Sequence, residues 1–289
     1  IILKQDIPLV NVIEKGRDDW VLDRSRSAFD LDQIEHLESG DFDFNDYFFP
    51  DMLIPLETAR GCYGSCEFCA IPSGSNTGFR ERSVGKIIND IVEVQKHTLK
   101  EYGLAATYFK FMDDTSSPRT LLHIAEEIHR RGIDAKWETY VRMEAVFQDS
   151  DVMKRLYKGG CRKLMWGLET NDPEILMNMA KKIAPISTNK VLDAAHDAGI
   201  LNFVFVLIGF PGEKQEQRDV LAEYIIACNS IHVLTLATFD VTKHSRMQTD
   251  STLPDDIKLE VEPSNGFEVR LPYVLNGENW KRVIVAEAQ

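Results

Sequence analysis

The sequence predicts an α/β fold organised as a partial (β/α)6 TIM-like barrel. Between residues 51 and 240, short apolar runs alternate with segments whose apolar residues repeat at helical spacing. The run at 200–208 is apolar almost throughout, which is typical of a parallel strand buried on both faces. Alternating strands and helices form parallel sheets with right-handed crossovers, and six such units suffice for an open barrel. An open doubly wound sheet is the alternative architecture.

The expected strands and helices follow one another through this core in a regular order. Strands are expected at six positions, namely 52–59, 105–112, 134–141, 161–166, 200–208 and 231–238. Ser83, Ser117 and Asp172 can cap the first turns of three helices, and Pro118 and Pro173 suit the first helical position. Glycines that favour a helix end follow three of the helical repeats, at 132, 159 and 199.

Two flanking segments lack this alternation. Residues 1–50 carry short apolar runs between many acidic residues, and we interpret them as a linker or wrapping segment. In residues 241–289, apolar residues alternate on both sides of a turn at 263–266, as in an antiparallel hairpin. We therefore expect a small β-rich extension after the core.

Composition and charge argue against several classes of protein. A chain of 289 residues that is 44% hydrophobic can bury a full core. Its net charge of −13 and pI near 5.0 oppose tight binding to nucleic acid. No apolar run approaches the roughly 20 residues of a membrane span. Three of the five cysteines cluster, which favours a metal site in a reducing compartment such as the cytoplasm over a disulfide framework.

The clustered cysteines, Cys62, Cys66 and Cys69, form a Cys-x3-Cys-x2-Cys array directly after the first expected strand. Three thiolates at this spacing can bind three irons of a cubane iron–sulfur cluster and leave the fourth iron open. A structural zinc site or a ferredoxin needs a fourth ligand, and no further Cys or His follows closely. Cys161 begins a strand and Cys228 lies near a helix end, so we expect neither to reach the array.

Polar or glycine-rich residues follow the next four expected strands in the same way. They are Asp113-Asp114, Arg142, Glu169 and the turn at 209–213. Because ligands of parallel α/β sheets bind at the carboxyl ends of the strands, these features are expected to converge with the cysteines on one face. Each feature also has a purely structural interpretation, as a turn, an ion pair, a helix-leading carboxylate or a strand-to-helix connection. Trp137 and Trp166 are expected in the core.

Several stretches of the chain resemble the radical S-adenosylmethionine (SAM) superfamily over about residues 50–238. Within it, they resemble the branch whose members often carry a cobalamin-binding domain ahead of the barrel. The stretches are LETARGCYGSCEFC, FRERSVGKI, FKFMDD, WETYVRMEA, GGCRKLMWGLET and LIGFPGE. The resemblance implies a partial barrel of radical SAM type, a 4Fe-4S cluster and SAM as cofactors, and a 5′-deoxyadenosyl radical that abstracts hydrogen from the substrate.

The same resemblance implies a role for each site residue. Cys62, Cys66 and Cys69 would bind the cluster, and Phe68 would pack near the adenine. The contacts to the rest of SAM would come from Asp113 or Asp114 (amino group), Arg142 (carboxylate), Glu169 (ribose), and Ile208 and Gly209 (adenine). The chain departs from the family pattern in two places. Met-Asp-Asp replaces the usual glycine-rich motif after the second strand, and Glu213 lies four residues after Gly209 rather than three.

The leading hypothesis for the reaction is cobalamin-dependent methylation of an unactivated carbon. The cobalamin signature Asp-x-His-x-x-Gly does not occur in the sequence, so a cobalamin-binding domain would precede Ile1, or the enzyme would be cobalamin-independent. CEFCAIP with Arg80 and Arg82 resembles the methylthiotransferases of tRNA or ribosomal protein, and the acidic charge opposes the tRNA version. A catalytically inactive, cluster-bearing scaffold is a third hypothesis.

An active enzyme of this kind would need two partners. One is a small-molecule or peptide substrate, and the other is a reducing protein such as a flavodoxin or ferredoxin. Nucleic acid and a membrane are not expected as partners.

Overall fold

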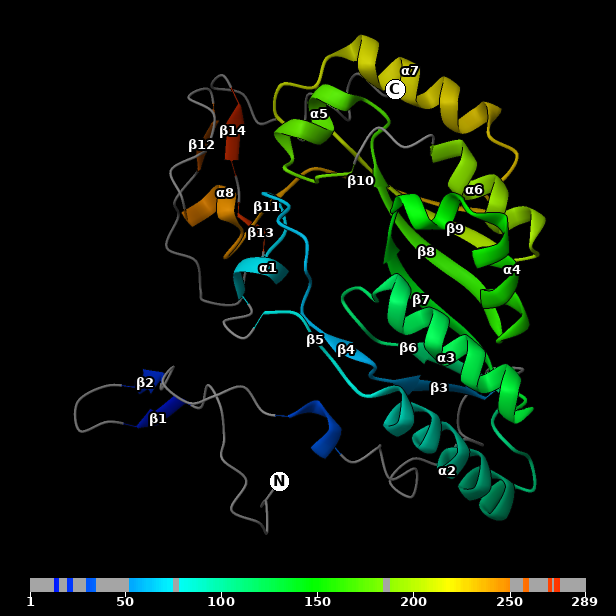
Figure 1. Cartoon of the computed structure of the whole chain (residues 1–289). Helices are drawn as coiled ribbons and strands as arrows, with labels where there is room; N and C mark the ends of the chain where they lie inside the picture. Colours follow the sequence, from blue (N-terminus) through cyan, green and yellow to red (C-terminus); the bar gives the residue numbers. More distant parts are fainter. Residues whose placement is uncertain are drawn as a thin grey trace.

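The computed structural model of the chain is built around a six-stranded parallel sheet (Figure 1). It describes residues 13–15, 20–22, 30–34, 52–74, 78–183, 188–249, 257–259, 270–271 and 273–275. The strands of the sheet are β3 (Leu53–Leu56), β6 (Tyr108–Phe111), β7 (Lys136–Arg142), β8 (Cys161–Glu169), β9 (Leu201–Ile208) and β10 (Val233–Thr238). Their spatial order is β10-β9-β8-β7-β6-β3, and every neighbouring pair is parallel.

This strand order confirms the predicted partial-barrel class. A doubly wound sheet reverses its strand order at a switch point, whereas the strands here follow one another in sequence order without a reversal. Strands β3 and β10 are the two edges of the described sheet, so the barrel is open between them. Because the six strands are parallel, their carboxyl ends lie at one edge and bring loops from distant parts of the chain together.

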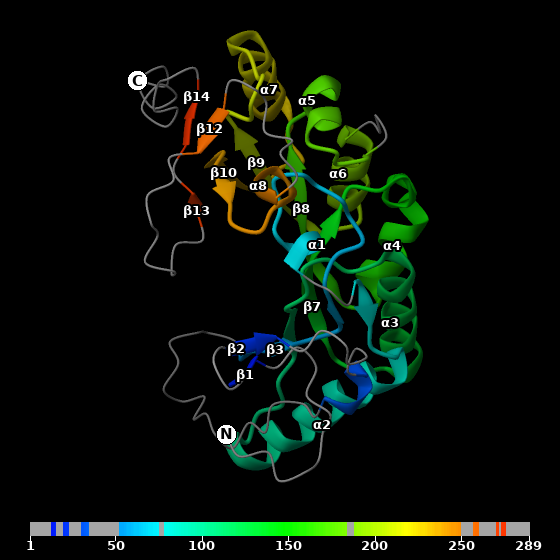
Figure 2. The same cartoon turned by 90° about the vertical axis from the view of Figure 1, so that its left-hand side faces the viewer.

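Helices α2, α3, α4 and α6 cover one face of the sheet (Figure 2). The helices between the strands are α2 (Val84–Tyr102), α3 (Pro118–Arg131), α4 (Ser150–Lys158), α5 (Pro173–Asn178), α6 (Thr188–Asp197) and α7 (Gln215–Ala227). The side chains of Ser83, Ser117 and Asp172 accept hydrogen bonds from backbone N–H groups in the first turns of α2, α3 and α5. The three predicted helix caps are therefore confirmed.

The hydrophobic core lies between these helices and the sheet. Phe111, Trp137 and Trp166 are completely buried there. The indole N–H of Trp137 donates to the Gly159 carbonyl oxygen at 2.8 Å, and that of Trp166 donates to Asn202 Oδ1 at 2.7 Å. Both tryptophans are core residues with a satisfied polar atom, as predicted.

Two strand boundaries differ from the predicted ones. The first strand ends at Leu56 rather than at 59, because the backbone N–H groups of Thr58 and Ala59 donate to Asp113 instead of to a neighbouring strand. The fourth strand continues past its expected end at 166 and reaches Glu169, with a register shift after Gly167. Glu169 is therefore the last residue of a bulged strand rather than the first residue of a loop.

Short elements flank the barrel. Strands β1 (Ile13–Lys15) and β2 (Trp20–Leu22) form an antiparallel pair that no repeat in the sequence indicates. After the barrel, β11 pairs with β13 and β12 pairs with β14, both antiparallel, and the predicted turn at 263–266 lies outside the described residues. The remaining elements are η1 (Leu31–Gln33), β4 (Ala59–Arg60), α1 (Ile71–Gly74), β5 (Arg80–Glu81), η4 (Ala145–Gln148), β11 (Val241–Thr242), α8 (Arg246–Thr249), β12 (Ile257–Leu259), β13 (Arg270–Leu271) and β14 (Tyr273–Leu275).

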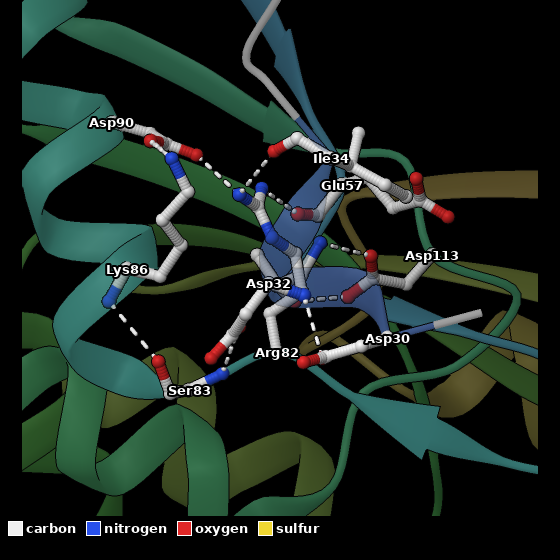
Figure 3. A network of polar contacts seen from close by, with 10 residues as sticks. Asp30, Asp32, Ile34, Glu57, Arg82, Ser83, Lys86, Asp90 and Asp113 are labelled. Carbon is white, nitrogen blue, oxygen red and sulfur yellow. Dashed lines mark hydrogen bonds and ion pairs between the residues drawn. The ribbon is translucent and has the colours of Figure 1, made fainter. Parts of the chain in front are cut away.

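Arg82, just before α2, joins three parts of the chain (Figure 3). Its Nη2 lies 2.5 Å from Asp90 Oδ2 and 3.2 Å from the carbonyl oxygen of Ile34. Its Nη1 donates to the carbonyl oxygen of Glu57 at 3.0 Å. These bonds hold residues 30–34 against the start of α2 and the end of β3. Since Arg82 is only 4% exposed and both of its terminal nitrogens are engaged in these bonds, it is not available to bind nucleic acid.

Candidate functional site

The three clustered cysteines lie on the loop between β4 and α1, beyond the carboxyl end of β3. Cys66 is buried, and Cys62 and Cys69 are half-buried. The backbone N–H of Gly64 donates to Cys62 Sγ at 3.2 Å, and that of Cys69 donates to the Cys66 carbonyl oxygen at 3.3 Å. Burial raises the pKa of the Cys62 and Cys69 thiols above the ordinary value. A bound metal centre would offset this effect because it takes cysteines as thiolates.

Three thiolates without a fourth nearby ligand suit a cubane cluster with one open iron better than a structural zinc site, which takes four ligands. A zinc ion with Zn–S bonds of about 2.3 Å would draw its thiolates to within about 4 Å of one another. Within the described residues, no three Cys, His, Asp or Glu side chains are gathered closely enough to bind one ion. A cubane cluster would instead bind the three thiolates to three different irons and leave the fourth iron without a protein ligand.

Arg142, the last residue of β7, reaches into the cysteine loop. Its Nη1 donates to Cys66 Sγ at 3.6 Å, and its Nη2 donates to the carbonyl oxygen of Lys181. The guanidinium lies 5.9 Å from the centre of the Tyr63 ring. A Cβ atom on Gly64 would lie 2.4 Å from Arg142 Nη1, so a side chain there would displace the guanidinium from its present position. Arg142 therefore places a positive charge beside the buried thiol.

Asp113 and Asp114, which the sequence analysis could not tell apart, occupy different environments. Asp113 is 3% exposed, and its Oδ1 accepts from the backbone N–H groups of Thr58 and Ala59 at 2.7 and 2.8 Å. Its Oδ2 accepts from the hydroxyls of Thr58 and Ser116. Burial raises the pKa of Asp113 to about 6, and these hydrogen bonds oppose the rise. Asp113 therefore fixes the backbone at Thr58 and Ala59, just before the cysteine loop.

Asp114 is exposed at the same edge of the sheet. Its Oδ2 accepts a hydrogen bond of 3.0 Å from the backbone N–H of Gly61, the residue before the first cysteine. Gly61 has a φ of 82°, a left-handed conformation that favours glycine. Asp114 is thus the aspartate whose carboxylate remains accessible beside the cysteine loop.

Glu169 forms a buried ion pair that the sequence analysis did not predict. Lys181 Nζ lies 2.5 Å from Glu169 Oε1, and the two side chains are 5% and 15% exposed. The register shift after Gly167 gives Glu169 a φ of 64°, a conformation that residues other than glycine rarely adopt. The ion pair and the bulge together fix the carboxylate at the carboxyl end of β8.

Residues 179–182, which we call the bracket loop, hold the cysteine loop in place. The carbonyl oxygens of Met179, Ala180 and Lys181 accept hydrogen bonds from the Glu67 N–H (3.0 Å), the Ser65 hydroxyl (3.4 Å) and Arg142. Ala180 and Lys182 have φ values of 49° and 48°. Strained residues of this kind cluster at functional sites. No glycine or turn motif marks the loop in the sequence, so the sequence analysis missed it.

The turn at 209–213 follows β9, and Phe68 lies within the cysteine loop between Cys66 and Cys69. The carboxylate of Glu213 accepts a hydrogen bond of 2.5 Å from the backbone N–H of Gly209, and burial raises its pKa. Glu213 thus closes the turn after Ile208, a role that accommodates its spacing of four residues. Phe68 packs against a buried cluster that contains Phe210.

The other two cysteines of the chain lie away from this edge. Cys161 is completely buried at the start of β8, the opposite end of the parallel sheet, and burial raises the pKa of its thiol far above the ordinary value. Cys228 caps the carboxyl end of α7. Both positions agree with the expectation that neither residue reaches the array.

The family model described as the radical SAM superfamily matches residues 56–225. The chain belongs to the radical SAM superfamily. The enzymes of this superfamily use a 4Fe-4S cluster and SAM. The matched region contains the cysteine array, the bracket loop and the carboxyl ends of β3, β6, β7, β8 and β9.

Several curated proteins are similar to part of this chain. An uncharacterized methyltransferase from Pyrococcus horikoshii is 27% identical over 58% of this chain and 35% of the relative. A bacteriochlorophyllide d C-12(1)-methyltransferase from Chlorobaculum tepidum is 24% identical, with 60% and 37% covered. A ribosomal protein uS12 methylthiotransferase from Chlorobium phaeobacteroides is 24% identical, with 64% and 43% covered. The chain spans less than half the length of each of these three relatives.

The fold also resembles that of a solved radical SAM methyltransferase, TsrM from Kitasatospora setae, whose structure contains cobalamin and a 4Fe-4S cluster. The TM-score is 0.61 at 15% identity, with 77% of this chain and 49% of that chain covered. At this identity the likeness concerns the fold. Among the described helices of the present chain, none has the length and apolar character needed to cross a membrane.

Proposed function

We propose that this chain is the core of an enzyme that cleaves SAM reductively and methylates an unactivated carbon of its substrate with the help of cobalamin. The observation that carries the proposal is the convergence of the cysteine array with Asp114, Arg142 and Glu169 at one edge of the sheet. When bound there, the cluster and SAM would supply a 5′-deoxyadenosyl radical for hydrogen abstraction.

The residues around the array would bind and orient SAM. Cys62, Cys66 and Cys69 would hold three corners of the cluster and leave one iron for the amino and carboxylate groups of SAM. The accessible carboxylate of Asp114 suits the amino group, while Asp113, whose oxygens all bind inside the protein, would only brace the loop.

The remaining residues would hold the other parts of the molecule. Arg142 is suited to the carboxylate, and Glu169, fixed by Lys181, is suited to the ribose hydroxyls. Ile208, Gly209 and Phe68 would line the adenine. A preset constellation of this kind places the sulfonium beside the cluster without further reorganisation.

The relatives support methylation as the use of the radical. Two of them are named as methyltransferases, and the solved structure of similar fold contains cobalamin. Since the chain covers less than half of those proteins, we propose that another part of the whole protein binds cobalamin. A flavodoxin or ferredoxin would supply the electron.

The test uses the full-length protein, purified and reconstituted with iron and sulfide in the absence of oxygen. With dithionite and SAM, we expect release of 5′-deoxyadenosine, and we expect the purified protein to show the absorbance of bound cobalamin. Cys66→Ala should abolish 5′-deoxyadenosine, while the matched variant Cys228→Ala should retain it. No 5′-deoxyadenosine from the wild type would contradict the proposal and favour an inactive scaffold. Its release from a protein without cobalamin would contradict cobalamin-dependent methylation alone.

A methylthiotransferase is the second candidate, because one of the relatives is named as acting on ribosomal protein uS12. An enzyme of that kind needs a second cluster as a sulfur source. An iron content of about eight per full-length protein, instead of about four, would favour it over the methyltransferase. The burial of Arg82 and the net charge of −13 argue against a tRNA substrate.

A further inference from the structure

The sheet has a second face opposite helices α2, α3, α4 and α6 (Figure 2), and we call it the open face. Three charged residues lie in a row on this face. Lys110 on β6, Glu138 on β7 and Lys163 on β8 are direct neighbours in register across the three strands. Their strand neighbours Trp137 and Leu164 are buried in the core on the helix side, so the charged side chains point to the open face.

The row contains more positive than negative charge. Lys163 Nζ lies 2.6 Å from Glu138 Oε2, and Lys110 Nζ lies 3.8 Å from Glu138 Oε1. The side chain of Glu138 is 6% exposed, whereas each lysine side chain is 26% exposed. Glu138 also accepts from the Tyr108 hydroxyl at 3.3 Å. The buried carboxylate of Glu138 thus interacts with both lysines and with Tyr108. The two lysines and one glutamate carry a net charge of +1, and the lysines are partly accessible to a ligand.

An aromatic surface continues from this row toward the cysteine edge. Tyr140 follows Glu138 by two positions on β7 and therefore lies on the open face as well. Lys110 Nζ lies 5.5 Å from the centre of its ring. The Tyr140 and Phe205 rings stack with centres 5.9 Å apart, and the Phe203 and Phe205 rings lie 5.0 Å apart. Charge and aromatic rings therefore form one continuous surface.

This surface leads to the proposed SAM position. Every second residue of β7 lies on the open face, namely Glu138, Tyr140 and Arg142. Arg142 in turn contacts Cys66. At about 3.3 Å per residue, the charged row lies about 13 Å below the level of Arg142. A molecule held by the lysines and lying along the rings would present its far end to the cysteine edge.

We propose that the open face binds the substrate, and that the substrate is an organic carboxylate with a flat apolar body. Lys110 and Lys163 would bind the carboxylate, since one surplus positive charge matches one negative charge. Tyr140, Phe203 and Phe205 would hold the body by stacking. This inference rests on the proposed function, because it places the far end of the substrate where a radical would form.

The test measures binding of two probes of nearly the same shape, the anion 1-naphthaleneacetate and its neutral amide. Isothermal titration uses the reconstituted chain with SAM. We expect the carboxylate to bind the wild type at least about tenfold more tightly than the amide, because charge-assisted hydrogen bonds contribute roughly 1.5–3 kcal/mol. In Lys110→Met/Lys163→Met this preference should disappear. Lys154→Met, which removes an exposed lysine from α4 on the other face, should preserve it.

Equal binding of the two probes to the wild type, or an unchanged preference in the double variant, would overturn the inference. If the double variant does not fold, as judged by circular dichroism, Lys163→Gln alone is used, and a preference that stays at the wild-type value would overturn the inference equally. The binding readout is independent of SAM cleavage. A wild-type protein that forms 5′-deoxyadenosine but binds both probes equally refutes this inference alone, whereas absent cleavage by the wild type refutes the proposed function.

Discussion

Asp113 and Asp114 are adjacent in the chain, but Asp113 is buried and hydrogen-bonded within the protein, whereas Asp114 is exposed beside the cysteine loop. Both follow β6, and the sequence pattern alone makes either one a candidate for the amino group of SAM. The difference comes from Thr58 and Ala59, more than 50 positions earlier, whose backbone N–H groups turn to Asp113. A contact over that separation leaves no local signal. The same holds for Glu169, whose partner Lys181 lies beyond an intervening helix.

This difference predicts opposite outcomes for two matched substitutions. Asp113→Asn keeps an oxygen for the two N–H donors and gives the hydroxyls of Thr58 and Ser116 an N–H that they can accept. We therefore expect Asp113→Asn to fold and to cleave SAM, and Asp114→Asn to weaken SAM binding about tenfold or more. Equilibrium binding of SAM to the reconstituted variants is the measurement. Stronger loss in Asp113→Asn than in Asp114→Asn would contradict the assignment.

The pH dependence of stability provides a second readout for Asp113→Asn. The pKa of Asp113 is about 6 in the folded chain and 3.8 ordinarily, so the folded state binds this proton more tightly. The resulting stability is present below pH 4 and is lost as the pH rises through 6. Between pH 7 and 5, the wild type should gain about 1.4 kcal/mol relative to Asp113→Asn in urea unfolding. A constant difference between them would show that Asp113 does not titrate in this range.

At the scale of elements, the predictable parts were those that carry their own local signals. The helices after Ser83, Ser117 and Asp172 begin at the expected caps, because a cap is a contact within a few residues of its helix. The bracket loop has no such signal. Its backbone is held by carbonyl contacts to the cysteine loop, and its left-handed residues are Ala180 and Lys182 instead of glycine. Tertiary contacts, therefore, decide the conformation of the element that supports the array.

Strain in the bracket loop is measurable by glycine substitution. A left-handed conformation costs an alanine roughly 1–2 kcal/mol, and glycine relieves this cost while losing more chain entropy on folding. We expect Ala180→Gly to be neutral or to stabilise the protein by up to about 1 kcal/mol in urea unfolding. The control Ala194→Gly, inside α6, should lose about 1 kcal/mol. Equal destabilisation of the two variants would mean that Ala180 is not strained.

At the scale of the whole molecule, the sequential order of six parallel strands produces the site. It sets the carboxyl ends of β3, β6, β7, β8 and β9 around one edge, which is why five separate sequence features converge. Apolar periodicity and the parallel-sheet rule were sufficient to predict this convergence. They could not predict the open face, because the row of Lys110, Glu138 and Lys163 depends on the register between strands, including a shift after Trp137.

The central claim is that the three cysteines hold a cluster whose open iron binds SAM. The most direct measurement is electron paramagnetic resonance of the reduced, reconstituted chain before and after SAM is added. We predict about four irons per chain and a 4Fe-4S signal that shifts with SAM, and we predict that Cys62→Ala, Cys66→Ala and Cys69→Ala lose it while Cys228→Ala retains it. A cluster signal that SAM leaves unchanged, or one that survives in Cys66→Ala, would contradict the account.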